Sequence, residues 1–223
     1  MKKIVFATNN AHKLEELRQI MAGKFEILSL NDIDCHEDIP ETADTIKGNA
    51  EMKAQYVMRH YGYNCFSDDT GLEIDALNGA PGVHSARYGG VAHDSERNID
   101  RVLREMKDVP MEQRTARFRT VVALIEREED NITEFPLRFE NMKFFEGKVE
   151  GIILTERHGE GGFGYDSIFQ PVEGDGRTFA QMLPEEKNAI SHRGRALAAL
   201  CAAIHERTRV CVPGRASARP DCG

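Results

Sequence analysis

The sequence predicts an α/β fold in which one mixed β-sheet is shared by two lobes, with a cleft between the lobes. In the first half of the chain, strand-like apolar runs alternate with segments of helical periodicity. In the middle, β-like segments follow one another without an intervening helix, which is typical of antiparallel strands. An Ala- and Leu-rich stretch after Ser191 predicts a last helix that ends at about Glu206. Clefts of this kind commonly hold ligands.

Periodicity and capping residues place the individual elements. Helices are predicted from the polar turn at 8–12 as far as Gly23, and at 45–61 and 94–106. Strands are predicted at 3–7, 25–30, 64–67, 116–126, 132–139 and 148–154. Residues 207–223 are rich in Arg, Gly, Pro and Ser, so we expect a disordered tail after a single two-lobed domain at 1–206.

Composition and charge limit the classes of function. Of the 223 residues, 40% are hydrophobic and 30% charged, as in ordinary globular proteins. The formal net charge of −8 argues against a nucleic-acid groove, and an enzyme of polyanionic nucleotides would need local lysines, arginines or a divalent metal. No apolar run approaches the roughly 20 residues of a membrane span. Residues 1–7 are too few for a signal-peptide core, so we expect a cytoplasmic protein with free thiols.

Two polar segments in the first third of the chain are candidates for phosphate and metal chemistry. The turn at 8–13 leads into a helix whose first N–H groups favour an anion, and Lys13 opposes the helix dipole there unless a phosphate binds. Asp68 and Asp69 follow a strand, with Glu41 upstream, and Mg²⁺ prefers such oxygen ligands. The structural alternatives are a solvated turn with a surface lysine, and an Asx turn after the strand.

Two later segments are candidates for base recognition. Residues 161–166 read Gly-Gly-Phe-Gly-Tyr-Asp and precede a strand-like run at 167–169 instead of a helix, which excludes the dinucleotide-binding fingerprint. Phe163 could stack on a base or pack into the core. Ser191 is a good N-cap, but the histidine and two arginines at 192–195 oppose the helix dipole. They indicate either a functional site or side chains that reach solvent.

Taken together and in this order, these motifs resemble those of the inosine triphosphate pyrophosphatase family, also called Ham1-like. The matching stretches lie at 8–13, 41, 49–54, 67–72, 79–88, 162–166 and 191–194, within roughly residues 1–205. The resemblance implies a two-lobed α/β fold around a long mixed sheet with flanking helices, an active site in the central cleft, and a homodimer. It also implies a Mg²⁺-dependent enzyme that hydrolyses ITP, dITP and XTP to monophosphate and pyrophosphate.

The resemblance assigns roles residue by residue. The triphosphate would be bound by Thr8, Asn9, Asn10, Ala11, His12 and Lys13, assisted by Lys53. Mg²⁺ would be held by Glu41 and Asp69; Asp69 would also accept the proton of the attacking water, with Asp68 close by and Thr70 touching the substrate. The base would be held by Phe163, Gly164, Tyr165, Asp166, Lys187, His192 and Arg193. The chain departs from the family at Ser167, where proline is usual, and in its tail.

Arg193 offers a physical reason for base selectivity. A guanidinium group has only donors, so it suits a 6-oxo purine and would meet the amino group of adenine donor to donor. A site built on such hydrogen bonds can reject the mismatched group by about 10⁴-fold. Guanine also carries a 6-oxo group, so this argument does not exclude GTP.

Three other functions stay open at this point. The first is a Maf-like pyrophosphatase for pyrimidine or modified nucleotides, against which the Ser-His-Arg-Gly motif at 191–194 argues. The second is a non-catalytic nucleotide sensor, against which the set of Lys13, Glu41 and Asp69 argues. The third is a nucleic-acid-binding module, which the acidic balance and the lack of a basic stripe disfavour.

Overall fold

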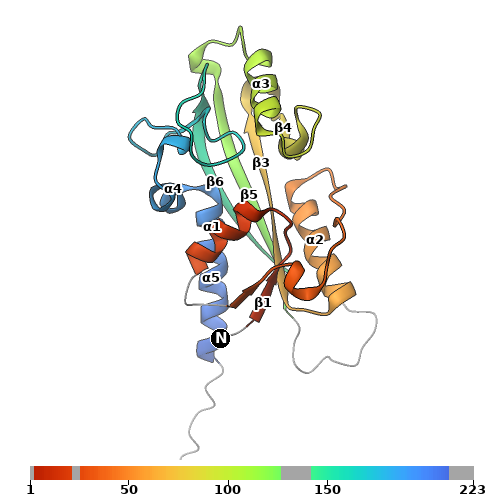
Figure 1. Ribbon diagram of the computed structural model, residues 1–223. Helices are drawn as coiled ribbons and strands as arrows, with labels where there is room; N and C mark the ends of the chain where they lie inside the picture. The colour runs from red at the N-terminus through yellow and green to blue at the C-terminus, as the bar shows by residue number, and fades with distance from the viewer. Residues whose placement is uncertain (1–2, 22–25, 127–141, 211–223) are drawn as a thin grey trace, which may run out of the picture.

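A computed structural model describes residues 3–21, 26–126 and 142–210 (Figure 1). These residues form one seven-stranded sheet in the order β2-β1-β3-β5-β6-β7, with β4 paired to β3. The strands are β1 Lys3–Phe6, β2 Glu26–Leu28, β3 Cys65–Ile74, β4 Pro81–Gly82, β5 Thr115–Ile125, β6 Lys143–Ile153 and β7 Phe169–Pro171. The helices are α1 Ala11–Met21, α2 Ile46–Tyr61, α3 Ser95–Glu105, α4 Pro184–Ile190 and α5 His192–Val210. None of these helices is long and apolar enough to cross a membrane.

The sheet is mixed, and its long central strands serve both lobes. β1 runs parallel to β2 and β3, whereas β3, β5, β6 and β7 pair antiparallel in succession. In Figure 1, β3, β5 and β6 extend from the region of α2 and α5 at one end to that of α3 at the other. The predicted mixed α/β sheet shared by two lobes is therefore confirmed.

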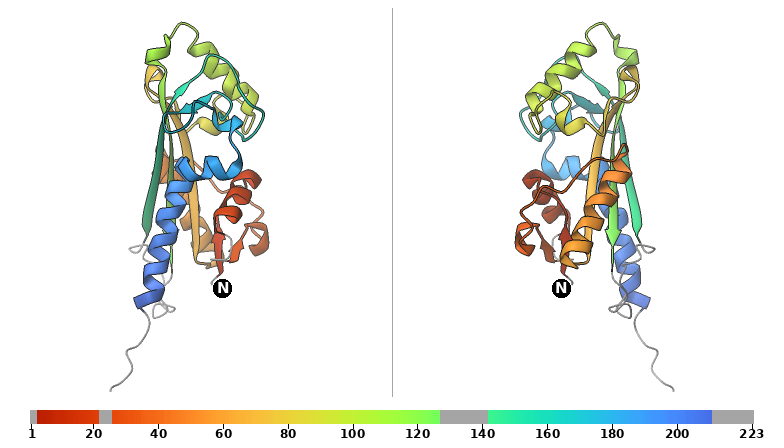
Figure 2. Two further views of the ribbon diagram at one scale, coloured as in Figure 1. Left: turned by 90° about the vertical axis from the view of Figure 1, so that its left-hand side faces the viewer. Right: turned by 90° about the vertical axis from the view of Figure 1, so that its right-hand side faces the viewer.

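In the lobe that contains β1, helices cover both faces of the sheet (Figure 2). Successive side chains of a strand point to opposite faces. Cys65 accordingly packs in the cluster that includes α2, whereas Phe66 packs in the cluster that includes α1 and α5. The same alternation on β5 sends Val121 to the first cluster and Val122 to the second. This burial of both faces explains why the inner strands have long apolar runs.

The second lobe is built on the far ends of the long strands. A third buried cluster joins Leu72 and Ile74 of β3 to Ile99 and Val102 of α3, and it extends to Phe169 of β7. The α3 helix begins where the sequence predicts, because the Asp94 side chain accepts a hydrogen bond from the Arg97 N–H (3.0 Å). The lobe thus has its own core, separate from those around α2 and α5.

The start of α5 sits directly against the middle of β6. Ser191 caps the helix, since its Oγ accepts from the Gly194 N–H (3.0 Å). Gly147 of β6 lies beneath the first turn, and a Cβ atom there would collide with the His192 carbonyl oxygen. The lack of a side chain at Gly147 therefore allows the first residues of α5 to lie on the sheet.

The predicted helices are present, with Thr45 as the N-cap of α2 and Gly62 in the left-handed conformation that ends it. The prediction of a short strand at 64–67 is wrong, because β3 continues to Ile74. Asp-Asp-Thr-Gly is thus strand and not an Asx turn, since every residue of β3 pairs with β5. β6 begins five residues before the predicted Lys148, and α4 was not predicted.

The predictions for the last helix, the tail and the strand at 132–139 have different outcomes. The last helix continues past Glu206 to Val210, so the predicted tail is helical in its first four residues. The rest of that tail, 211–223, lies outside the described residues, as does the predicted strand at 132–139.

Candidate functional site

The site begins at an open stretch on one edge of β3. β1 pairs with β3 as far as Phe66, and β4 pairs with it again from Leu72. Between these two points, no strand among the described residues covers this edge. A cleft of about 770 Å³ lies there, and Asp69 and Thr70 line it. That volume is within the usual range of about 300–1,000 Å³ for small-molecule sites.

All but one of the residues that the sequence predicts for the site line this single cleft. They are Thr8, Asn9, Asn10, Ala11, His12, Lys13, Glu41, Lys53, Asp69, Thr70, Phe163, Gly164, Tyr165, Asp166, Lys187, His192 and Arg193. The exception is Asp68, whose side chain is fully buried behind the lining. The carboxylates at 41 and 69 and the amines at 13 and 53 therefore converge on one cavity.

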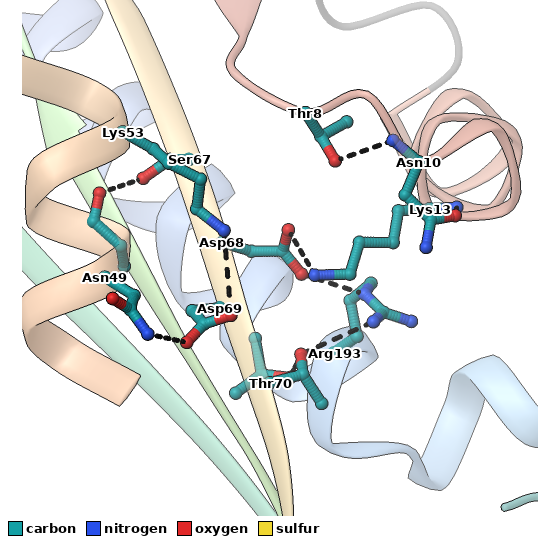
Figure 3. Close-up of polar contacts among 12 residues, drawn as sticks. Thr8, Asn10, Lys13, Asn49, Lys53, Ser67, Asp68, Asp69, Thr70 and Arg193 are labelled. Carbon is teal, nitrogen blue, oxygen red and sulfur yellow. Dashed lines mark hydrogen bonds and ion pairs between the residues drawn. The ribbon is translucent and has the colours of Figure 1, made fainter. Parts of the chain in front are cut away.

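Asp68 is held between two cations that come from opposite ends of the chain (Figure 3). Lys13 Nζ lies 3.1 Å from Asp68 Oδ1, and Arg193 Nε lies 3.2 Å from Asp68 Oδ2. Burial by itself would raise the pKa of this carboxyl, but Lys13 and Arg193 outweigh it and hold the pKa well below its usual 3.8. Asp68 is therefore a structural anion that positions two cleft cations.

Lys13 is not the solvated surface lysine of the structural alternative. The turn before it is fixed locally, because Thr8 Oγ1 accepts from the Asn10 N–H (3.2 Å) and Asn10 Oδ1 accepts from the Lys13 N–H (3.1 Å). The Lys13 side chain is only 13% exposed. Burial, together with Lys53 and Arg193 nearby, lowers the pKa of Lys13 in spite of Asp68. A phosphate in the cleft would stabilise its charged form.

On the opposite face of β3, Asp69 points towards α2 (Figure 3). Asn49 Nδ2 donates to Asp69 Oδ2 (3.3 Å), while Asn49 Oδ1 accepts from the Ala43 N–H (2.9 Å) in the segment that carries Glu41. Lys53 Nζ lies 2.6 Å from Glu41 Oε1 and 3.6 Å from Asp69 Oδ1. One buried amide and one ammonium thus hold the two carboxylates at a common point.

The charges of Glu41 and Asp69 favour the binding of a cation, and the pKa of Asp69 favours the uptake of a proton. Burial raises the pKa of Asp69, and the charges of Lys53 and Lys13 do not fully offset that effect. Burial also opposes the charge of Lys53, but Asp69 and Glu41 outweigh it and raise the Lys53 pKa. Proteins commonly bind Mg²⁺ through one or two carboxylates, and water and phosphate oxygens supply its other ligands. The pair Glu41 and Asp69 therefore fits Mg²⁺.

At the other end of the cleft, an aromatic ring is surrounded by polar and cationic groups. Phe163 is half-buried, and its ring stacks on His12 at 5.5 Å between centroids. Lys187 Nζ and the Arg193 guanidinium carbon lie 4.8 and 5.5 Å from the centre of the Phe163 ring. Asp166 Oδ2 accepts from Lys187 Nζ (2.8 Å) and from the Phe163 N–H (2.9 Å). Phe163 thus faces the cleft and does not belong to the core.

The basic residues at the start of α5 divide into two groups. His192 and Arg193 are buried and face the cleft, so the alternative that they reach solvent is wrong for this pair. Arg195 does extend to the surface, where it donates to the Lys148 carbonyl (2.7 Å) and pairs with Glu173. Of the two arginines in the first turn, Arg193 is thus the one that the fold brings to Asp68 and to the cleft, whereas Arg195 pairs with a surface carboxylate.

Sequence reasoning gave no role to several residues that complete the site. Asn49 and Lys53 are the two polar residues on the buried face of α2, and Thr120 interrupts the apolar series of Phe118, Val122 and Leu124 on one face of β5. Those interruptions were the available signals for Asn49 and Thr120. The second lobe contributes further lining residues, namely Ser85, Ala86, Ala92, His93, Ser95 and Asn98. They come from the 3-10 turn and loop before α3 and from the first turns of α3 itself. The stretch at 79–88 was among the matching motifs, but no role was assigned to its residues.

The buried triad predicts a specific dependence of stability on pH. Asp68→Asn is expected to lower the free energy of unfolding at neutral pH by about 3 kcal/mol, because Lys13 and Arg193 lose their buried counter-ion. The folded-state pKa of Asp68 lies below the unfolded one, so its charge stabilises the fold above about pH 4 and this contribution is lost as the pH falls further.

Urea unfolding of wild type and variant at a series of pH values measures this effect. The difference between the two proteins should shrink as the pH falls below about 4. Asp75→Asn is the control, since Asp75 pairs with Arg117 at the surface and should change stability by less than about 1 kcal/mol. A difference that stays constant with pH would contradict the assignment of a charged Asp68.

Comparisons with known proteins bear on the identity of the fold and its cleft. Residues 4–203 match the model of the Ham1 family. A dITP/XTP pyrophosphatase of Porphyromonas gingivalis is 52% identical over 200 residues, which cover 90% of this chain and 96% of the relative. A HAM1 protein structure from Coxiella burnetii has a TM-score of 0.79 and 38% identity, covering 92% of this chain and all of the other.

A crystal structure described as a nucleoside-triphosphatase / dITP/XTP pyrophosphatase from Mycobacterium abscessus has a TM-score of 0.69 and 41% identity, covering 89% of this chain and 98% of that one. These matches extend over the long strands and the cleft between the lobes, and they confirm the resemblance found from the motifs. The chain belongs to the Ham1 family.

Proposed function

We propose that this protein hydrolyses purine nucleoside triphosphates with a 6-oxo base, such as ITP, dITP and XTP, to the monophosphate and pyrophosphate. The observation that supports this most is that one cleft has amines and carboxylates at one end and an aromatic ring with hydrogen-bond donors at the other. The names of the relatives, dITP/XTP pyrophosphatase, agree with the proposal.

The polyphosphate would lie along the turn before α1 and over Lys13 and Lys53. These two amines carry the positive charge at this end, and both are largely buried, so their attraction to phosphate is little screened by solvent. They would stabilise the charge that grows on the leaving pyrophosphate as the bond to the α-phosphorus breaks. The local cations thus compensate for the overall negative charge of the chain.

Asp69 would accept the proton of the water that attacks the α-phosphorus. Burial raises the pKa of Asp69 in the metal-free site, which favours uptake of a proton by this carboxylate. Asn49 holds one carboxylate oxygen, so the orientation of the base is fixed before the substrate binds. Mg²⁺ bound by Glu41 and Asp69 would neutralise phosphate charge and lower the pKa of a bound water.

The base would lie at Phe163, near the donors of α4 and α5. Arg193 and Lys187 offer only donors, which suits a 6-oxo group and opposes the 6-amino group of adenine. Arg193 is fixed in this position by its bond to Asp68, so the donor cannot easily turn away from the wrong base. The homodimer implied by the resemblance and the cytoplasmic location expected from residues 1–7 stay predictions.

A substrate panel tests the proposal directly. Pyrophosphate release is measured with ITP, XTP, dITP, GTP and ATP, each with and without Mg²⁺. We expect release from the first three, little from ATP, and loss of activity when the metal is chelated. Binding of ITP without release of pyrophosphate would favour the sensor, and a preference for pyrimidine nucleotides would favour the Maf-like enzyme.

Asp69→Asn is expected to lower kcat by on the order of 10²–10⁴-fold, because the amide cannot accept the proton of the attacking water. The measurement is made at saturating Mg²⁺, so that weaker metal binding does not account for the loss. Asp75→Asn, a surface carboxylate one residue past the end of the same strand, should leave kcat unchanged. Near-wild-type turnover of Asp69→Asn would remove Asp69 from the chemistry.

Arg193→Ala is expected to narrow the ratio of kcat/KM for ITP over that for ATP, because the donor facing the 6-position is lost. Arg195→Ala is the matched control. It removes a guanidinium two residues along the same helix that points to the surface and pairs with Glu173, and it should keep the wild-type ratio. An unchanged ratio in Arg193→Ala would place base recognition elsewhere.

A further inference from the structure

A series of side-chain hydrogen bonds runs behind the cleft from β3 over β5 to α5. Thr120 of β5 lies directly opposite Thr70 of β3 in the strand register, and Thr120 is fully buried. Its Oγ1 lies 2.7 Å from Thr70 Oγ1 and 2.6 Å from His192 Nδ1. Thr70 and His192 both line the cleft, one beside Asp69 and the other at the base end. Thr120 therefore connects two cleft residues without touching the cleft itself.

These hydrogen bonds can run in two directions, and the tautomer of His192 corresponds to the direction. Arg193 Nη2 lies 3.4 Å from Thr70 Oγ1, and a guanidinium can only donate. That contact takes one lone pair of Thr70 and leaves its proton available to Thr120. With Thr70 donating, the proton of Thr120 points to His192 Nδ1, and the hydrogen bonds form a series of donors that ends at the imidazole ring. The reverse direction, from an Nδ1–H through Thr120 to the second lone pair of Thr70, uses the same distances, and the tautomer of His192 distinguishes the two.

The hydrogen bond from Thr120 can determine the tautomer of the His192 imidazole. Burial, reinforced by Arg193 and Lys187, lowers the pKa of His192 well below its usual value, so the ring is neutral. A neutral imidazole carries its proton on either Nδ1 or Nε2, and the partner of one nitrogen decides which. Phe118 stacks on the ring at 4.8 Å between centroids and fixes its plane. Nε2 is then the nitrogen left to a ligand in the cleft.

We propose that Thr120 is a positioning residue that holds His192 in the tautomer with the proton on Nε2, and that it thereby adds to the preference for 6-oxo bases. This rests on the proposed function. An Nε2–H group donates to the oxygen of a 6-oxo purine and repels the 6-amino group of adenine. The other tautomer would present a lone pair, which accepts from that amino group. One buried hydroxyl thus sets which base the ring favours.

The competing explanation is that Thr120 only fills space between β3 and α5. Valine has nearly the same shape as threonine but lacks the hydroxyl, so Thr120→Val separates the two explanations. Thr120→Ser keeps the hydroxyl and loses a methyl group, which makes it the matched control. Thr120→Ala is the second hydroxyl-free variant, should valine disturb the fold.

The tautomer is measured first, by ¹⁵N NMR of the imidazole nitrogens in ligand-free protein. The signals of His192 are identified by their loss in His192→Gln. We expect an unprotonated Nδ1 and a protonated Nε2 in the wild type and in Thr120→Ser. In Thr120→Val and Thr120→Ala we expect a mixture of tautomers. A wild-type ring with the proton on Nδ1 would overturn the proposal, whatever the variants do.

The consequence for selectivity is measured by kcat/KM for ITP and ATP. The ratio should fall by about three- to tenfold in the hydroxyl-free variants, as for the loss of one hydrogen bond, and be retained in Thr120→Ser. An unchanged ratio in a variant whose tautomer has changed would also overturn the role in selectivity. Absence of hydrolysis by the wild type contradicts the proposed function instead, and the NMR result then decides on Thr120 separately.

Discussion

The rest of the site depends on the buried charge of Asp68. A carboxylate without access to water is costly unless cations and hydrogen bonds compensate it. Here the compensation comes from Lys13 at the start of α1 and Arg193 at the start of α5. The two helices must therefore dock on β3 in one register. That register brings the turn at 8–13 and the base-binding donors to opposite ends of the same cleft.

The cleft itself depends on an interruption in the pairing of β3. Because β1 ends at Phe6 and β4 pairs only from Leu72, side chains from both faces of β3 reach the gap. Consecutive aspartates can then have different roles. Asp68 organises the cations on one face, whereas Asp69 contacts the Lys53 ammonium and the Asn49 amide on the other face. In a fully paired strand the two faces would be separated by the sheet.

Four cations at the cleft, each paired with a carboxylate, would allow this acidic chain to bind a polyanion. The cations at 13, 53, 187 and 193 each lie within 4 Å of a specific carboxylate in this structure. Such pairing fixes their side chains before a ligand arrives, so little conformational freedom is lost on binding. The hydroxyls of Thr70 and Thr120 extend the same network from Arg193 to His192.

The sequence by itself determined the α/β class, the capped helices and most of the residues that line the cleft. Capping and periodicity are local, so Thr45, Gly62 and Asp94 could be identified without a fold. The length of β3, the burial of Asp68 and the participation of Thr120 were decided only by tertiary structure. Asp-Asp-Thr-Gly reads locally as a turn. It becomes strand because β5 satisfies its backbone and because Lys13 and Arg193, distant in sequence, compensate its charge.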